Sequence, residues 1–107
     1  MAFVNQIEVT ELAERLRGVE PIELFDVRTP VEIATASVDG ARPFDEQAQD
    51  RIARLPRETP LVFLCHHGMR SQQVAMYYAA QGFTDVSNVV GGIDAWSLVV
   101  DPDVPRY

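Results

Sequence analysis

Short apolar segments alternate along the chain with longer segments whose apolar residues recur every three or four positions. The short segments have the length and residue types of strands, and the longer ones have the spacing of one buried helix face. The predicted strands cover residues 7–9, 22–28, 41–44, 61–65 and 86–90. The predicted helices cover residues 11–17, 30–36, 45–55, 71–81 and 93–100. This alternation predicts an α/β fold with a mainly parallel sheet and helices on both sheet faces.

Capping residues indicate where two of these helices begin. Thr29, Pro30 and Glu32 form a capping box with proline at the first helical position, so that each polar side chain binds a backbone N–H group of the other residue. We assign Glu32 no role beyond this cap. Thr10 is the predicted N-cap of the first helix. Both helices are therefore expected to follow their strands after short turns.

The chain has the size and composition of one globular domain over residues 1–107, with residues 101–107 as an extended, proline-punctuated tail on the surface. It has no apolar run close to the about 20 residues of a membrane span. It also lacks the basic-then-apolar start of a signal peptide, so we expect a cytoplasmic location. The single cysteine forms no internal disulfide, which agrees with a reducing compartment.

The charge balance is strongly acidic. Acidic residues number 16 against nine basic ones, all of them arginine, and the formal net charge is −7. This balance argues against nucleic acid or an anionic membrane as a partner. Any anion site must therefore be local, made of backbone N–H groups and a few arginines.

The only cysteine, Cys65, stands between a predicted buried strand and a long helix. In this position the thiol faces the free N–H groups and the positive end of the helix dipole, which lower a thiol pKa and favour the nucleophilic thiolate. Asp26 and Arg28 lie at the carboxyl end of another predicted strand. Ligands of parallel sheets bind at these strand ends, so we predict one site containing all three residues.

Four segments in order resemble the rhodanese-like sulfurtransferase domains, in their short single-domain form. They are the Asp-Val-Arg segment of residues 26–32, the turn of residues 38–41, the cysteine loop of residues 65–71 and the Gly-Gly…Trp segment of residues 90–96. Two positions depart from the family pattern. Ser37 replaces a common histidine, and Asp39 replaces the proline of the turn. Neither is the nucleophile, so the departures concern local packing.

The resemblance implies a five-stranded parallel sheet between helices and a sulfurtransferase that works through a Cys65 persulfide. Sulfane sulfur would pass from an anionic donor such as thiosulfate to cyanide or a thiol. Donor binding would fall to the loop residues His66, His67, Gly68, Met69, Arg70 and Ser71. Their backbone N–H groups would surround the sulfur, Arg70 would bind the donor's oxyanion, and Ser71, at the helix N-cap, would donate a hydrogen bond to the sulfur.

The remaining charged and titratable residues near the cysteine receive simpler roles. Asp26 and Arg28 are predicted to form a structural ion pair beneath the loop rather than to contact the substrate directly. Either one imidazole of His66 and His67 lines the mouth of the site, or both are partly exposed loop side chains. We predict no metal, because adjacent side chains in a tight loop diverge and no second cluster of ligands is evident. No organic cofactor is implied.

We consider three alternative functions for a chain with this strand–cysteine–loop–helix pattern. A cysteine-dependent phosphatase or arsenate reductase needs five residues between cysteine and arginine, whereas only four separate Cys65 from Arg70. A persulfide carrier would accept sulfur from a protein donor for thiolation or cofactor assembly. A binding module of the same fold would lack turnover, and such modules typically lack the cysteine. The sequence does not separate the enzyme from the carrier.

Overall fold

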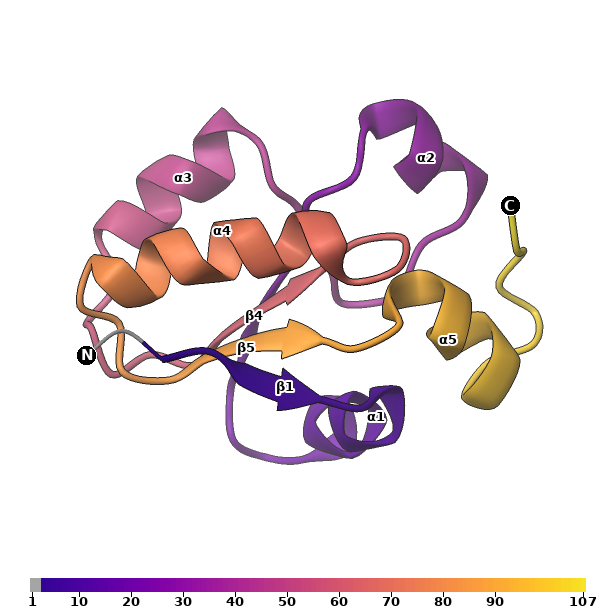
Figure 1. Ribbon diagram of the computed structural model, residues 1–107, viewed down its shortest axis with the longest axis horizontal. Coiled ribbons are helices and arrows are strands. Elements are labelled where there is room, and N and C mark those ends of the chain that lie inside the picture. Colours follow the sequence, from indigo (N-terminus) through magenta and orange to yellow (C-terminus); the bar gives the residue numbers. More distant parts are fainter. Residues whose placement is uncertain (1–2) are drawn as a thin grey trace.

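The computed structural model describes residues 3–107, in which five strands form one parallel sheet (Figure 1). The strands are β1 (Asn5–Ile7), β2 (Glu23–Asp26), β3 (Arg42–Pro43), β4 (Leu61–Leu64) and β5 (Val86–Val89). The helices are α1 (Val9–Arg17), α2 (Pro30–Thr35), α3 (Glu46–Ala53), α4 (Met69–Ala80) and α5 (Gly92–Val99). The strand order is β1-β5-β4-β2-β3, and all four pairings are parallel. The predicted α/β fold is confirmed.

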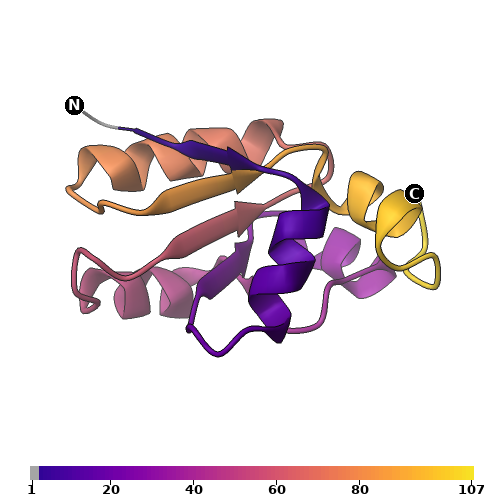
Figure 2. The same ribbon diagram turned by 90° about the horizontal axis from the view of Figure 1, so that it is seen from below.

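Two hydrophobic clusters cover the two faces of the sheet. Successive residues of a strand point to opposite faces, and this divides the buried strands between the clusters. Leu24 and Leu64 pack with residues of α1 and α5, whereas Phe25 and Phe63 pack with residues of α3 and α4. Figures 1 and 2 show α4 and α1 on opposite sides of the strands. Every residue of β4 is buried, as a central parallel strand requires.

Two predicted boundaries near the start of the described chain are wrong by one or a few residues. The first strand is shifted to Asn5–Ile7 because it pairs with β5, and Val9 begins α1 with its side chain in the core. Glu8 is the N-cap there, without a side-chain capping bond, so Thr10 is not the cap. The capping box of Thr29 and Glu32 is present as predicted.

The loops after β2, β4 and β5 meet at one edge of the sheet. Asp26 pairs with Leu64 in register, and the Val27 N–H donates to the Leu64 carbonyl over 2.9 Å. From the other side, the N–H groups of Ile93 and Asp94 in α5 donate to the carbonyls of Cys65 and His66, over 2.8 and 3.1 Å. The cysteine loop is therefore held by backbone hydrogen bonds from α5.

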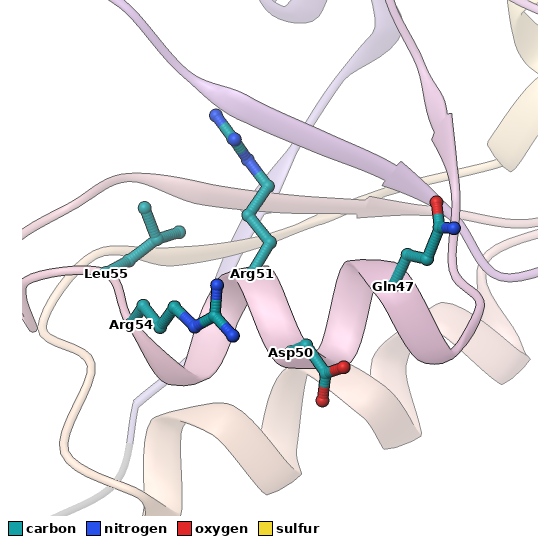
Figure 3. A pocket seen from close by; sticks show the side chains of 5 residues that line it. All are labelled: Gln47, Asp50, Arg51, Arg54 and Leu55. Carbon is teal, nitrogen blue, oxygen red and sulfur yellow. The ribbon is translucent and has the colours of Figure 1, made fainter.

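A shallow hollow lies elsewhere, along α3 (Figure 3). Its lining residues are Gln47, Asp50, Arg51, Arg54 and Leu55. Arg51 is paired with Glu23, the first residue of β2, which places the hollow toward the amino ends of the strands. Within residues 3–107, no helix combines the length and apolar content needed to cross a membrane.

Candidate active site

Cys65 directly follows β4, and its sulfur is surrounded by hydrogen-bond donors. The residue is 1% exposed. The Gly68 N–H donates to Sγ over 3.0 Å and the Ser71 hydroxyl lies 3.2 Å from it. The backbone N–H groups of His67 and Ser71 also help to lower the pKa of the thiol. One backbone N–H group and one hydroxyl thus donate to this sulfur, and the full ring of loop donors around a bound sulfur stays a prediction.

The donors favour the thiolate. Burial raises the pKa of the Cys65 thiol, but the hydrogen bonds from the Ser71 hydroxyl and from the N–H groups of Ser71, Gly68 and His67 outweigh it. The net effect holds the pKa below its ordinary value. A thiolate rather than a thiol is the nucleophilic form of cysteine.

The loop takes this shape because glycine occupies the position before α4. Gly68 is the N-cap of α4 and has φ +104°, a conformation that side chains disfavour. A Cβ there would also lie 3.2 Å from the Val89 carbonyl oxygen. Ser71 is therefore inside the first turn of the helix, and the prediction that it is the N-cap is wrong. Its hydroxyl reaches the sulfur all the same, because Met69 rather than Ser71 begins the helix.

Asn88 is a site residue that the sequence analysis did not identify. It is buried in β5, and its Nδ2 donates to the Gly68 carbonyl over 3.1 Å and to the Gln6 Oε1 over 3.0 Å. Its Oδ1 accepts from the Ser71 hydroxyl. Because a hydroxyl has one proton, Ser71 can donate to only one of the Asn88 Oδ1 and the Cys65 sulfur at a time. A polar residue within a predicted buried strand was the signal that could have revealed it.

Replacing Ser71 with alanine is expected to make Cys65 less reactive near neutral pH. The change removes a hydrogen bond to the thiolate, so the pKa of Cys65 rises toward its ordinary value. The measurement is the rate of alkylation by iodoacetamide as a function of pH, whose midpoint is expected to move to higher pH. Ser97→Ala is the matched control, since Ser97 is a buried helical serine that bonds only the Ile93 carbonyl. An unchanged midpoint in Ser71→Ala would contradict the assignment.

Arg70 is paired with Glu32. Two hydrogen bonds of 2.7 and 3.0 Å join its guanidinium to the carboxylate. This pair holds the pKa of Glu32 well below its usual range and raises that of Arg70. The expectation that Glu32 serves only as a cap is wrong, because its carboxylate also binds an arginine 38 positions along the chain. Contact between Arg70 and a donor anion stays a prediction.

Asp26 and Arg28 form a buried ion pair, at 2.6 Å between Nη2 and Oδ2. The other Arg28 donors bind the carbonyls of Glu32 and Ala36 and the Tyr107 hydroxyl. All five N–H bonds of this guanidinium are thus used, which leaves none for a substrate. The geometry favours the structural interpretation, in which the pair anchors the end of β2 to α2.

His66 and His67 lie side by side, and the prediction that their side chains diverge is wrong. Their ring centroids are 3.9 Å apart, and His67 Nε2 lies 4.0 Å from Asp94. Potential ligand atoms of these three residues lie within 4.8 Å of one another. The two rings are tilted by 31° to one another, and the Asp94 carboxylate is held by Arg106 at 2.9 Å. Met69, the remaining loop residue, is 80% exposed.

The fold and the site define an α/β protein with a buried cysteine at the carboxyl end of a central strand. A family model described as the rhodanese-like domain matches residues 8–98. The chain is 37% identical over 94 residues to a Pseudomonas aeruginosa protein named thiosulfate sulfurtransferase GlpE, covering 87% of this chain and 84% of that protein. The chain belongs to the rhodanese-like family, a family of sulfurtransferases, as the four motifs predict.

Two further comparisons agree with this assignment. The chain is 40% identical over 112 residues to the chloroplastic rhodanese-like/PpiC domain-containing protein 12 of Arabidopsis thaliana, with 97% of this chain covered but only 38% of that protein. The crystal structure of a rhodanese-like domain protein from Staphylococcus aureus superposes with a TM-score of 0.76 at 28% identity. The superposition covers 97% of this chain and 99% of the Staphylococcus aureus chain. The predicted cytoplasmic location stays a prediction.

Proposed function

We propose that this protein transfers sulfane sulfur from a small anionic donor such as thiosulfate to a thiol or cyanide, through a persulfide on Cys65. The observation that carries the proposal is the pair of N–H and O–H donors to a sulfur with a lowered pKa. Such donors stabilise negative charge on this sulfur in the resting enzyme. They would do the same for a persulfide, whose outer sulfur is also anionic.

The two steps balance without a cofactor. The Cys65 thiolate attacks the outer sulfur of thiosulfate, an S–S bond forms at Sγ, and the S–S bond of the donor breaks to release sulfite. The product, Cys65–S–S⁻, keeps one negative charge. Cyanide or a thiolate then attacks the outer sulfur, leaves as thiocyanate or a new persulfide, and returns Cys65 to the thiolate. These are the two half-reactions of double-displacement kinetics.

The first half-reaction gives the test of the proposal. Mixing the protein with excess thiosulfate and no acceptor is expected to release sulfite in a single burst equal to the amount of protein. Later addition of cyanide is expected to yield the same amount of thiocyanate. A protein that releases no sulfite, although its thiol is free to alkylate, would contradict thiosulfate as donor. Transfer from a protein donor instead would favour a persulfide carrier, and no transfer from any donor would favour a binding module.

Arg70→Ala is expected to weaken the use of thiosulfate. The guanidinium is the cation beside the site, and losing a charged hydrogen-bond partner of the donor costs about tenfold or more in kcat/KM for thiosulfate. Discharge of the persulfide to cyanide is expected to change less. Arg51→Ala is the matched control, because Arg51 forms a similar exposed pair with Glu23 at the other end of the sheet. Unchanged kcat/KM for thiosulfate would mean that the backbone donors alone bind the anion.

A further inference from the structure

The sulfur of Cys65 is covered in a protein whose proposed reaction requires direct contact with it. Cys65 is 1% exposed, and reacting atoms must come within about 3–3.5 Å. On one side Ser71 and Asn88 enclose the site, and both are buried and hydrogen-bonded to the loop or its sulfur. The side chains of Arg70 and Glu32 and the last residue, Tyr107, are at least partly exposed. A path to the sulfur can therefore open among these exposed groups.

Tyr107 joins the elements on this exposed side. Its ring stacks on His66, next to the cysteine, with centroids 4.1 Å apart and planes 9° from parallel. Its hydroxyl accepts from Arg28 Nη1 and donates to Glu32 Oε2, both over 2.8 Å. Through Glu32 it also touches the pair that holds Arg70. One side chain thus connects the cysteine loop, the end of β2 and helix α2.

The tail that carries Tyr107 crosses to this position from α5. It is not fully extended as predicted, because Asp101 to Val104 form a turn closed by a 3.1 Å backbone hydrogen bond. Val104 packs against the core, and Arg106 is paired with Asp94. Figure 1 shows the end of the tail near α2, at the edge toward which the strand arrows point. The tail is held by a few side-chain contacts, whereas the cysteine loop is held by buried backbone bonds.

We propose that Tyr107 is a specificity-determining residue, which covers the approach to Cys65 and admits small sulfur donors and acceptors more readily than bulky ones. The proposal rests on the proposed function for its substrates, but the cover itself does not depend on sulfur chemistry. The His66 stack and the two hydroxyl bonds close this side of the site, and their loss opens it. In this account His66 acts as the surface on which Tyr107 rests.

The test compares the alkylation of Cys65 by a small and a bulky reagent, iodoacetamide and fluorescein maleimide. If the cover is open about one time in ten or less, Tyr107→Ala is expected to raise the bulky reagent's rate about tenfold more than the small reagent's. Tyr107→Phe keeps the stack on His66 and loses the hydroxyl bonds. Its rate with the bulky reagent is therefore expected to lie between those of the unchanged protein and Tyr107→Ala. Tyr77→Ala, which removes a 59%-exposed tyrosine of α4, is the control and is expected to change neither rate.

The outcomes separate this proposal from the proposed function. An equal change in the alkylation rates of both reagents would show an altered thiol or a general loosening of the fold. Unchanged rates would show that Tyr107 does not cover the sulfur. Either result overturns the proposal. The midpoint of the iodoacetamide pH profile is expected to stay in place, since Tyr107 does not bond the sulfur. Alkylation needs no sulfur donor, so a protein with a size-selective thiol and no sulfur transfer would contradict the proposed function alone.

Discussion

Replacing Cys65 with alanine is expected to lower sulfur transfer by at least about a thousandfold, because the change removes the nucleophile itself. The chain has no second cysteine to replace it. The fold is expected to survive, since the loop is held by α5 through the backbone carbonyls of Cys65 and His66, which alanine keeps. The measurement is the rate of thiocyanate formation from thiosulfate and cyanide, beside a thermal unfolding curve.

Cys65→Ser is the matched control for this loss. Serine keeps a polar atom near Sγ that accepts hydrogen bonds from Gly68 and Ser71, so the surrounding donors stay paired. It is expected to be as inactive as alanine, because a serine hydroxyl is much harder to deprotonate than a thiol and forms no alkoxide near neutral pH. Substantial transfer by either folded variant would contradict the assignment of Cys65 as the nucleophile.

The second large effect is expected from Gly92→Ala, which alters no group that reacts. Gly92 has φ +59°, and a Cβ there would lie 2.3 Å from the Cys65 carbonyl oxygen and 2.5 Å from that of His66. Both oxygens belong to the loop that positions the sulfur and its donors. The loop or α5 must move, and a displacement near 1 Å at a reacting group costs about a hundredfold in rate.

Gly82→Ala separates this contact from the cost of the backbone conformation. Gly82 has φ +100°, but a Cβ there would meet only the Arg57 side chain at 3.8 Å, outside the site. A left-handed alanine costs about 1–2 kcal/mol in stability, and Gly82→Ala is expected to show that loss with little change in activity. Gly92→Ala is expected to lose more stability and most of its activity. Similar activity in the two variants would contradict the role of Gly92 in positioning the loop.

The sequence was sufficient for the layout of the fold and for the position of the thiol. The alternation of apolar segments predicts the parallel sheet because buried positions recur with the period of the strand or helix that carries them. The strand–cysteine–helix order predicts hydrogen-bond donors at the sulfur. The capping box of Thr29 and Glu32 is visible because it is local. Boundaries were less accurate, as at Ser71, because the left-handed conformation of Gly68 allows α4 to begin two residues earlier.

The contacts that complete the site were not predictable in the same way. Arg70 is exposed and Glu32 is partly buried, on different helices, and Tyr107 is in an irregular tail. Pairs of this kind leave no periodic pattern, since neither partner needs to be apolar or regularly spaced. Asn88 is the exception, because a polar side chain in a fully buried strand requires partners, and here it finds them in Ser71 and Gly68.

The most direct test of the account is the intact mass of the purified protein before and after incubation with thiosulfate, followed by a reducing agent. A gain of one sulfur atom is expected, which Cys65→Ser does not show and which the reducing agent reverses. No gain in a protein whose Cys65 is free to alkylate, or a gain that persists in Cys65→Ser, would contradict a persulfide on Cys65 formed from thiosulfate.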